Sequence, residues 1–461
     1  MFGDIGKLDV VREQLNEVSS SFCMAKWMHV TIHLMTGHTH SCYLPLPHKI
    51  PLSELKKDPS ALHNTKFKKI ARKQMKNGER PAECKICWDI EDLPGNNYSD
   101  RHYRGVDDWT LPYFEKVKNL KWDENINPSY VEVSFSSTCN FKCMYCSPTI
   151  STSWMQEIKK HGAIKLSKHD HQSIKWLKFK GHNPLEEDNN PYLDAFWEWW
   201  PNLVKDLMYF RITGGEPLLS PNTYKVLEWL NENPQDQLDL SINSNLGIPE
   251  KQMQRFMDLI KPLVADGKIK RHILHTSLDT WGEQAEYIRT GLKLNDFEKN
   301  LEWYLNEIPT GSVAFMCTFN NLSVVGFKQF LEYMLSLRKR FNNEKRQILL
   351  DIPHLQGPEI FSAQILTEDF YEKMNDLIAF MNERQDERIG IKKAEIQKME
   401  RILAWMKQEK SEDWLSHQRS DFYLYFKAHD ERRGTSFLET FPQMKEFWQL
   451  CERTYEIGLK S

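Results

Sequence analysis

Residues 131–149 read VEVSFSSTCNFKCMYCSPT, a short alternating run that leads directly into three closely spaced cysteines. Apolar and polar residues alternate over VEVSF with the two-residue period of a β-strand. The cysteines Cys139, Cys143 and Cys146 then follow at the spacing C-x3-C-x2-C. A strand that ends in a loop of three thiols is therefore the starting point for both the predicted fold and its chemistry.

Six strand-like runs alternate with longer segments of helical period between about residue 129 and residue 365. Six strand-then-helix units predict the α/β class, with a parallel sheet that is either open or rolled into a partial, TIM-like (β/α)6 barrel. In such folds the chemistry lies at the carboxyl ends of the strands, which is where the three-cysteine loop begins. The six runs are 130–136, 207–212, 237–242, 271–277, 312–318 and 347–352.

Three domains are predicted: 1–125, the core at 126–365, and a helical cap at 366–461. The first contains a hairpin that turns at Thr36-Gly37. It also contains a basic stretch, 53–78, which we interpret as a solvated helix rather than a nucleic-acid patch, because nearby acids offset its charge. The core includes a tryptophan-rich insertion at about 165–201, which is more typical of packed interior than of a substrate groove.

The 461 residues carry 61 Lys and Arg against 64 Asp and Glu, so the formal net charge is −3. This balance argues against a nucleic-acid partner. No apolar run approaches the ~18 residues that span a bilayer, and the N-terminus lacks a signal-peptide stretch, so we expect a cytoplasmic protein without a membrane partner. Nine cysteines in such a chain argue against a disulfide framework, and the isolated Cys317 and Cys451 are expected to be core residues.

The three thiols of the loop suit either iron–sulfur ligation or zinc, since both are bound by soft thiolates. A structural zinc site normally needs four ligands and a closed shell. Three thiolates on a four-iron cluster would leave one iron without a protein ligand. Such an open iron can bind a chelating substrate or cofactor. A loop with three cysteines instead of four is therefore what a cluster that binds such a ligand would need.

The loop resembles the signature of the radical S-adenosylmethionine (SAM) superfamily, including the aromatic Tyr145 before the third cysteine. Further motifs similar to those of the superfamily follow the later strands in the expected order. The matching residues are Gly214, Gly215 and Glu216 in RITGGEPLLSP, Ser244 and Asn245 in INSNLG, Ser277 and Asp279 in HTSLDT, and Arg289 in YIRTG.

The resemblance implies a cofactor role for each of these positions. The three cysteines would hold a 4Fe–4S cluster whose open iron binds the methionine end of SAM. The two glycines would let the backbone approach the SAM amine, and the arginine would offer a fork to its carboxylate. The remaining implied contacts are Glu216 to the amine, Ser277 and Asp279 to the ribose, Tyr145 to the adenine, and Ser244 and Asn245 in the neighbouring cofactor-binding turn.

A second group of cysteines precedes the core. Cys23, thirteen residues, Gly37, four residues and Cys42 resemble the C-x(9–15)-G-x4-C element of SPASM/twitch auxiliary-cluster domains, and Cys84-x-x-Cys87 completes four thiolates. The resemblance implies a second, auxiliary 4Fe–4S cluster that serves electron transfer or structure, with zinc as the alternative. Four nearby histidines are interpreted as solvent-facing strand residues rather than ligands: His29, His33, His38 and His40.

The resemblance further implies a function. The enzyme would reductively cleave SAM to a 5′-deoxyadenosyl radical that abstracts hydrogen from a peptide or small polar substrate, with electrons from a one-electron reductant such as flavodoxin or ferredoxin. One alternative is a radical SAM enzyme that modifies a nucleoside or nucleic acid. A more distant one is a non-catalytic iron–sulfur or zinc binding module. No general acid or base can be named, because HLQGPEIF at 354–361 lies at the right end of a strand without a specific motif.

Overall fold

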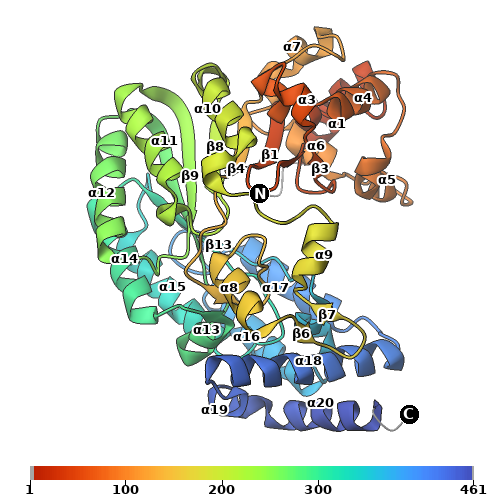
Figure 1. Ribbon diagram of the computed structural model, residues 1–461, viewed down its shortest axis with the longest axis vertical. Helices are drawn as coiled ribbons and strands as arrows, with labels where there is room; N and C mark the ends of the chain where they lie inside the picture. Colours follow the sequence, from red (N-terminus) through yellow and green to blue (C-terminus); the bar gives the residue numbers. More distant parts are fainter. Residues whose placement is uncertain (1–4, 459–461) are drawn as a thin grey trace. The chain divides into compact units, whose positions relative to one another are not determined.

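The computed structural model describes residues 5–458 (Figure 1). It divides into two compact units, each built from three stretches of the chain. Unit 1 comprises Met1–Ser137, Pro184–Ile242 and Pro262–His272, and unit 2 comprises Thr138–Asn183, Asn243–Lys261 and Ile273–Ser461. Strands β9 (Gln235–Ser244) and β10 (Ile269–Ser277) and helix α12 (Glu250–Ala265) each contain a boundary between the units.

Unit 1 is organised around a mostly parallel sheet. Its strands lie in the order β9-β8-β4-β1-β2-β3, and the four from β9 to β1 run parallel. The hairpin of β1 and β2 turns at Gly37, where φ is +63° and a Cβ atom would lie 2.2 Å from the ring of Tyr192. The strands are β1 (His29–His33), β2 (His38–His40), β3 (His48–Lys49), β4 (Tyr130–Ser134) and β8 (Tyr209–Thr213).

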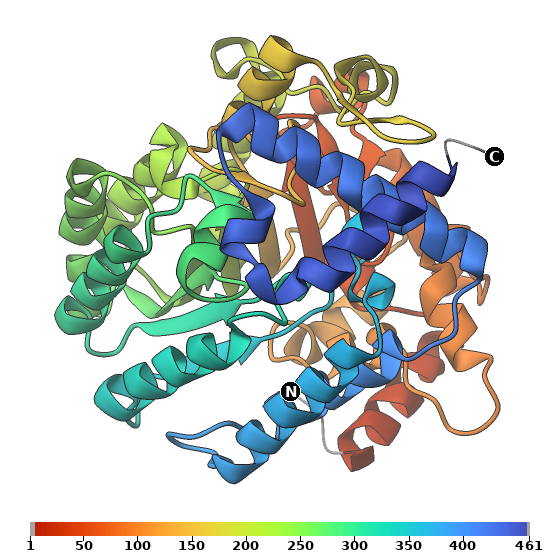
Figure 2. The same cartoon turned by 90° about the horizontal axis from the view of Figure 1, so that it is seen from below.

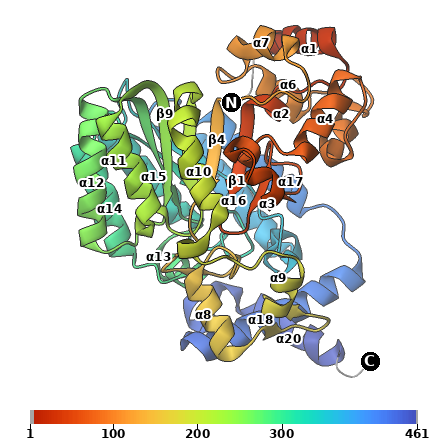
Figure 3. The ribbon, with the colours of Figure 1, turned by 45° about the horizontal axis from the view of Figure 1, so that its top comes forward.

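One face of this sheet is apolar and is covered by helix. Helix α10 lies over the sheet (Figure 3). Phe210 of β8 packs against Phe196 and Trp200 of α10, with ring centroids 6.4 and 4.9 Å apart. A second apolar cluster, which includes Phe22, Trp27 and Trp88, joins the short N-terminal helices. The helices of unit 1 are α1 (Ile5–Val18), α2 (Ala25–Met28), α3 (Leu52–Leu55), α4 (Lys66–Lys76), α5 (Lys85–Glu91), α6 (Asp100–Gly105), α7 (Phe114–Asn119), α10 (Pro191–Leu203) and α11 (Pro221–Glu232).

Unit 2 contains three parallel strands in the order β10-β12-β13, with β12 at Ser312–Met316 and β13 at Ile348–Asp351. Two short antiparallel pairs accompany them: β5 (Lys142–Cys143) with β11 (Arg289–Thr290), and β6 (Ile164–Lys165) with β7 (Asp170–His171). The long helices α18 and α20 lie side by side (Figure 2). The helices of this unit are α8 (Thr152–His161), α9 (Ile174–Phe179), α13 (Gly282–Ile288), α14 (Leu294–Glu307), α15 (Phe327–Phe341), α16 (Asp369–Glu383), α17 (Lys393–Met406), α18 (Glu412–Arg433), α19 (Phe437–Thr440) and α20 (Lys445–Gly458).

The α/β class, the six core strands, the N-terminal hairpin and the helical character of 366–461 are confirmed. Cys317 and Cys451 are fully buried, as expected. Closure into a partial barrel and the three domain boundaries stay predictions. Within the described residues, no helix combines the length and the apolar character that crossing a bilayer requires.

Two sequence interpretations are wrong. The basic helix α4 is not simply solvated, because Lys68 and Arg72 are buried and donate to backbone and side-chain acceptors in unit 1. The strand histidines do not all face solvent: three of the four are buried, because the hairpin is packed as a strand pair of the sheet rather than exposed at a free edge. The buried ones are His29, His38 and His40.

The tryptophan-rich insertion packs largely as predicted. Trp199 and Trp200 are buried in α10, and Trp197 stacks on Phe135 with ring centroids 6.0 Å apart. Trp176 differs: it is 56% exposed and stacks on Phe179 of the same short helix. Three of the four tryptophans therefore stabilise unit 1 by burying aromatic surface.

Candidate active site

The three-cysteine loop of unit 2 brings its thiols together. Cys143 lies in β5 and is buried, whereas Cys139 and Cys146 are partly exposed. The Cys146 amide donates to the Cys143 carbonyl at 3.0 Å, and the Phe141 amide donates to the Cys139 sulfur at 3.4 Å. Burial raises the pKa of the Cys146 thiol, and the two neighbouring thiols raise it further. Such mutual repulsion is relieved when a metal centre binds the sulfurs as thiolates.

Side chains from distant parts of unit 2 hold the backbone of this loop. The indole Nε1 of Trp154 donates to the Cys143 carbonyl at 2.7 Å, and the Tyr425 hydroxyl donates to the Met144 carbonyl at 3.0 Å. The Gln172 amide donates to the Cys146 carbonyl at 2.6 Å. These three anchors come from α8, α18 and the segment after β7, and no motif in the sequence pointed to them.

Arg433 at the end of α18 completes this support. Its guanidinium donates to the Lys142 carbonyl at 3.0 Å and pairs with Glu157 at 3.1 Å. Glu157 also pairs with the Lys142 ammonium at 2.7 Å. Burial raises the Glu157 pKa, but Arg433 and Lys142 together lower it below its ordinary value. Arg433 lies in the C-terminal run FKAHDERRGTSFLETFPQ at 426–443, so its proximity to the loop gives that distant stretch a structural role.

Tyr145, Asp279 and Arg289 form one network beside Cys143, in which Asp279 and Arg289 are buried and Tyr145 is partly exposed. Tyr145 donates to Asp279 at 2.7 Å, and the Arg289 guanidinium pairs with Asp279 at 2.9 Å. Arg289 also reaches the Cys143 sulfur at 3.7 Å, because β11 pairs with β5 and sets these two residues opposite each other. Burial disfavours the charge of Arg289, yet its neighbours Asp279, Tyr145 and Cys143 raise its pKa well above the ordinary value. The site therefore holds a charged arginine within reach of a thiol.

The turn that contains Ser244 and Asn245 docks on the same loop. The Ser244 hydroxyl accepts from the Leu246 amide at 3.0 Å, which supports the positive φ of 53° at Leu246. Asn245 donates to Asn140 at 2.9 Å, and Asn140 in turn donates to the Gly247 carbonyl at 2.7 Å. In this structure the two predicted residues thus shape the turn and tie it to the cysteine loop. Ser277 ends β10, opposite Met316 of β12.

The Gly214-Gly215-Glu216 motif lies in unit 1, directly after β8. Gly214 has a φ of +118°, and a Cβ atom there would lie 2.7 Å from both the Ser134 hydroxyl and the Ser136 carbonyl. The Gly215 amide donates to the Ser136 carbonyl at 2.9 Å. Only glycine allows this close approach of two backbone segments. Glu216 is buried, and its carboxylate accepts from the Leu218 amide at 3.0 Å.

The four N-terminal cysteines line a single cavity in unit 1. Burial raises the pKa of the Cys23 thiol, and the three other thiols raise it further. The four reach the cavity from four local structures: before α2, after β2, at the end of a short 3-10 helix (Ala82–Cys84), and in α5. The residues are Cys23, Cys42, Cys84 and Cys87.

The donor chemistry of both sites fits iron–sulfur clusters, since each is a set of neighbouring soft thiols. Among residues 5–458, no group of three or more His, Cys, Asp or Glu side chains is arranged around one point as it would be for a single metal ion. The four-cysteine group surrounds its cavity instead.

No family model matches this chain. A GTP 3′,8-cyclase of Campylobacter lari is 27% identical over 158 residues, which is 34% of this chain and 37% of that protein. A GTP 3′,8-cyclase of Sulfurovum sp. is 23% identical over 244 residues, 50% of this chain and 60% of that protein. This chain therefore spans less than two thirds of either relative. Both relatives carry the same name.

Proposed function

We propose that this chain is a radical SAM enzyme whose three-cysteine loop holds a 4Fe–4S cluster. The observation that carries the proposal is the network of Tyr145, Asp279 and Arg289 against Cys143. A structural loop gains nothing from a buried arginine directed at a thiol, and burying such a charge costs free energy. A SAM site would give every member of the network a binding role, because SAM brings a carboxylate and a ribose and would chelate the open iron of the cluster.

The chain's own residues would bind and orient SAM. Arg289 would donate two hydrogen bonds to its carboxylate, and Asp279 would accept from ribose hydroxyls, each held in place by the ion pair between them. Tyr145 would present its ring to the adenine. When bound, the cluster and SAM supply reductive cleavage of SAM and a carbon radical that removes hydrogen from substrate.

The four-cysteine cavity would hold the auxiliary cluster of a twitch-like domain. Four thiols around one cavity support a group with several metal atoms better than a lone zinc ion, whose four sulfurs lie at about 2.3 Å from one centre. With all four ligands from protein, this cluster would pass single electrons rather than bind substrate. Its electron partner would be a one-electron carrier of the flavodoxin or ferredoxin class.

The register of the unit 1 sheet supports a small polar substrate. One row across it reads Thr31, Glu132, Arg211 and Ser241, while the adjacent row reads Ile32, Val133, Ile212 and Ile242. Parallel strands are usually apolar on both faces. Here the polar face carries a Glu132–Arg211 pair at 3.7 Å whose side chains are 14% and 18% exposed. Burial raises the Glu132 pKa, and Arg211 counteracts this. A polar face of this kind suits a ligand with hydroxyl and charged groups.

A nucleotide is the second candidate substrate, because both relatives carry the name GTP 3′,8-cyclase. Within the first candidate, a sugar or amino-acid derivative fits the polar face better than an apolar peptide side chain. To separate a nucleotide from a small polar substrate, GTP is compared with sugars and short peptides as probes of the reaction.

The first experiment is anaerobic reconstitution of the full chain, followed by iron and sulfide analysis and by assay of 5′-deoxyadenosine with SAM and dithionite. About eight irons per chain with cleavage of SAM would support two 4Fe–4S clusters. Four irons and one zinc with cleavage would retain the radical enzyme and remove the auxiliary cluster. Metal without cleavage would contradict the enzyme and favour a binding module.

A further inference from the structure

A buried lysine in the wall of the four-cysteine cavity forms an ion pair with a partly exposed glutamate. Lys26 lines the cavity, its side chain is 3% exposed, and its Nζ lies 2.5 Å from the Glu83 carboxylate. Lys26 follows Cys23 by three residues, and Glu83 immediately precedes Cys84. Each member of the pair is thus attached to a different cysteine-bearing segment. Burial raises the pKa of the Cys84 thiol, and the positive charge of Lys26 counteracts this.

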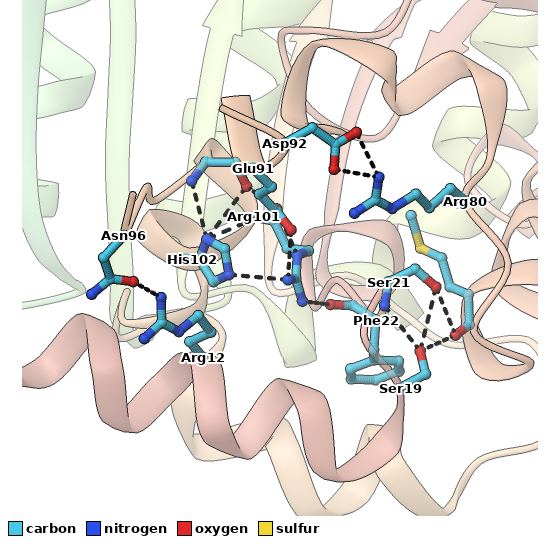
Figure 4. A network of polar contacts seen from close by, with 12 residues as sticks. Arg12, Ser19, Ser21, Phe22, Arg80, Glu91, Asp92, Asn96, Arg101 and His102 are labelled. Carbon is cyan, nitrogen blue, oxygen red and sulfur yellow. Dashed lines mark hydrogen bonds and ion pairs between the residues drawn. The ribbon is translucent and has the colours of Figure 1, made fainter. Parts of the chain in front are cut away.

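The other cations of the cavity have carboxylates of their own. Arg101 pairs with Glu91 at 2.9 Å and donates to the Phe22 carbonyl at 3.0 Å (Figure 4). Arg104 pairs with Asp100 at 3.3 Å. Lys26 lines the same cavity as the four thiols, and its charge counteracts the effect of burial on the pKa of three of them: Cys23, Cys42 and Cys84. Its charge therefore acts most directly on whatever the thiols hold.

We propose that the Lys26–Glu83 pair sets the reduction potential of the cluster held by the four cysteines, with Lys26 raising the potential and Glu83 lowering it. This inference rests on the proposed auxiliary cluster. Reduction adds one electron to the cluster from a one-electron donor; no bond forms or breaks, and no proton is required. A fixed charge in a buried site acts on that electron with little screening, so a cation favours the reduced state and an anion opposes it.

The two members have opposite signs, so their separate removal gives opposite results. Lys26→Met leaves the Glu83 carboxylate without its cation beside the cluster and should make reduction harder. Glu83→Gln leaves a buried ammonium and should make it easier. Removal of both charges should return the potential close to the original value, because the pair as a whole is neutral.

The test is a potentiometric titration of the reconstituted full chain, with the reduced cluster followed by electron paramagnetic resonance. Cys139, Cys143 and Cys146 are all replaced by Ala beforehand, so the signal belongs to the four-cysteine site. At fixed potential we expect Lys26→Met to lower the ratio of reduced to oxidised cluster about tenfold, a shift of about 59 mV for a one-electron couple. Glu83→Gln should raise the ratio about tenfold, the double variant should stay within about threefold, and Lys26→Arg should retain the original ratio.

Three outcomes would overturn the inference. Unchanged potentials in both single variants would show that the pair only joins two cysteine-bearing segments. Shifts of the same sign would point to a general disturbance of the cavity rather than to charge. A triple variant that binds zinc or no metal would overturn the auxiliary cluster and the inference with it, whereas iron with unmoved potentials would leave the cluster standing. If Lys26→Met fails to fold, the upward shift expected of Glu83→Gln still decides the matter.

Discussion

The two cysteine groups are built in opposite ways. The loop of Cys139–Cys146 gathers three thiols within eight residues and depends on long-range side chains only to hold its backbone. The cavity of unit 1 gathers four thiols from positions spread between 23 and 87, so its geometry depends on the packing of several short elements. In a local motif the donor residues are close in space because they are close in sequence, independently of how the rest of the chain folds. A dispersed set needs a folded core before it can bind anything.

The charged groups around the three-cysteine loop also differ from those around the four-cysteine cavity. Around the loop, Asp279, Tyr145 and Arg289 join each other and reach a thiol, an arrangement available to a small polar ligand. Around the cavity, each of the three cations pairs with at least one carboxylate, and apolar residues such as Trp88 and Met75 supply much of the remaining wall. The first site is suited to bind a cofactor, and the second to hold a closed group.

The largest expected effect separates the two sites outright. Cys143→Ala should reduce SAM cleavage by at least about 10³-fold, since an open iron needs all three thiolates. It should leave about half of the iron in place, because the cavity of unit 1 shares no ligand with the loop. Iron analysis measures the metal that remains, and 5′-deoxyadenosine formation measures the cleavage of SAM. Cys451→Ala, at a buried cysteine outside both groups, is the control; simultaneous loss of both metal sites would mean that the cysteines are wrongly divided.

A second prediction separates binding from folding at the loop. Arg289→Met leaves Asp279 buried without its guanidinium, which should cost about 3–5 kcal/mol of unfolding free energy in the protein without cofactors. The double variant Arg289→Met with Asp279→Asn should recover most of that loss but should not recover SAM binding. Urea denaturation and equilibrium SAM binding provide the two readouts. Restored SAM affinity in the double variant would contradict the assigned cofactor role.

The converse of the first prediction concerns the cavity. Cys87→Ala should remove the auxiliary cluster yet leave dithionite-driven SAM cleavage within about threefold of the original rate, a difference of under 1 kcal/mol in barrier. Conversion of substrate, once identified, should fall much further, because the electron relay is lost. A collapse of SAM cleavage itself would show that the loop depends on the cavity. Cys451→Ala, at a buried cysteine outside both groups, is again the control.

The smallest effect concerns the support of the loop and depends on pH. The Glu157 pKa is lowered in the folded protein, so its ionised form stabilises the fold above the ordinary pKa of about 4.5 and loses this effect as the pH falls through the lowered value. Glu157→Gln should therefore cost about 1.5 kcal/mol at pH 7, with the difference fading below pH ~4. Glu91→Gln is the parallel variant in unit 1. Burial raises the Glu91 pKa, but Arg101 lowers it below its ordinary value. A cost that stays constant with pH would point to packing rather than charge.

Local signals account for what could be predicted. The six strands were readable because each combines alternation or a short apolar run with turn residues at its end, and the hairpin was readable from Thr36-Gly37. The histidines and the basic helix were misread for one reason. Lys68, Arg72 and His40 look solvated from their neighbours in sequence, but all three are buried. Lys68 and Arg72 donate to the carbonyls of His29 and Lys26, which lie 39 and 46 residues earlier in the chain.

By itself, the sequence determined the α/β class, the order of the strands along the chain, the three-thiol loop and the glycines that only a tight backbone approach explains. These depend on period, spacing and steric demand, which are local properties. Tertiary structure alone decided that Trp154, Tyr425 and Arg433 hold the cysteine loop, that Asp279 and Arg289 bind each other, and that Lys26 meets Glu83 beside four thiols. Those partners lie between 10 and 291 residues apart along the chain, and only the packing of the folded chain brings such groups within hydrogen-bonding distance.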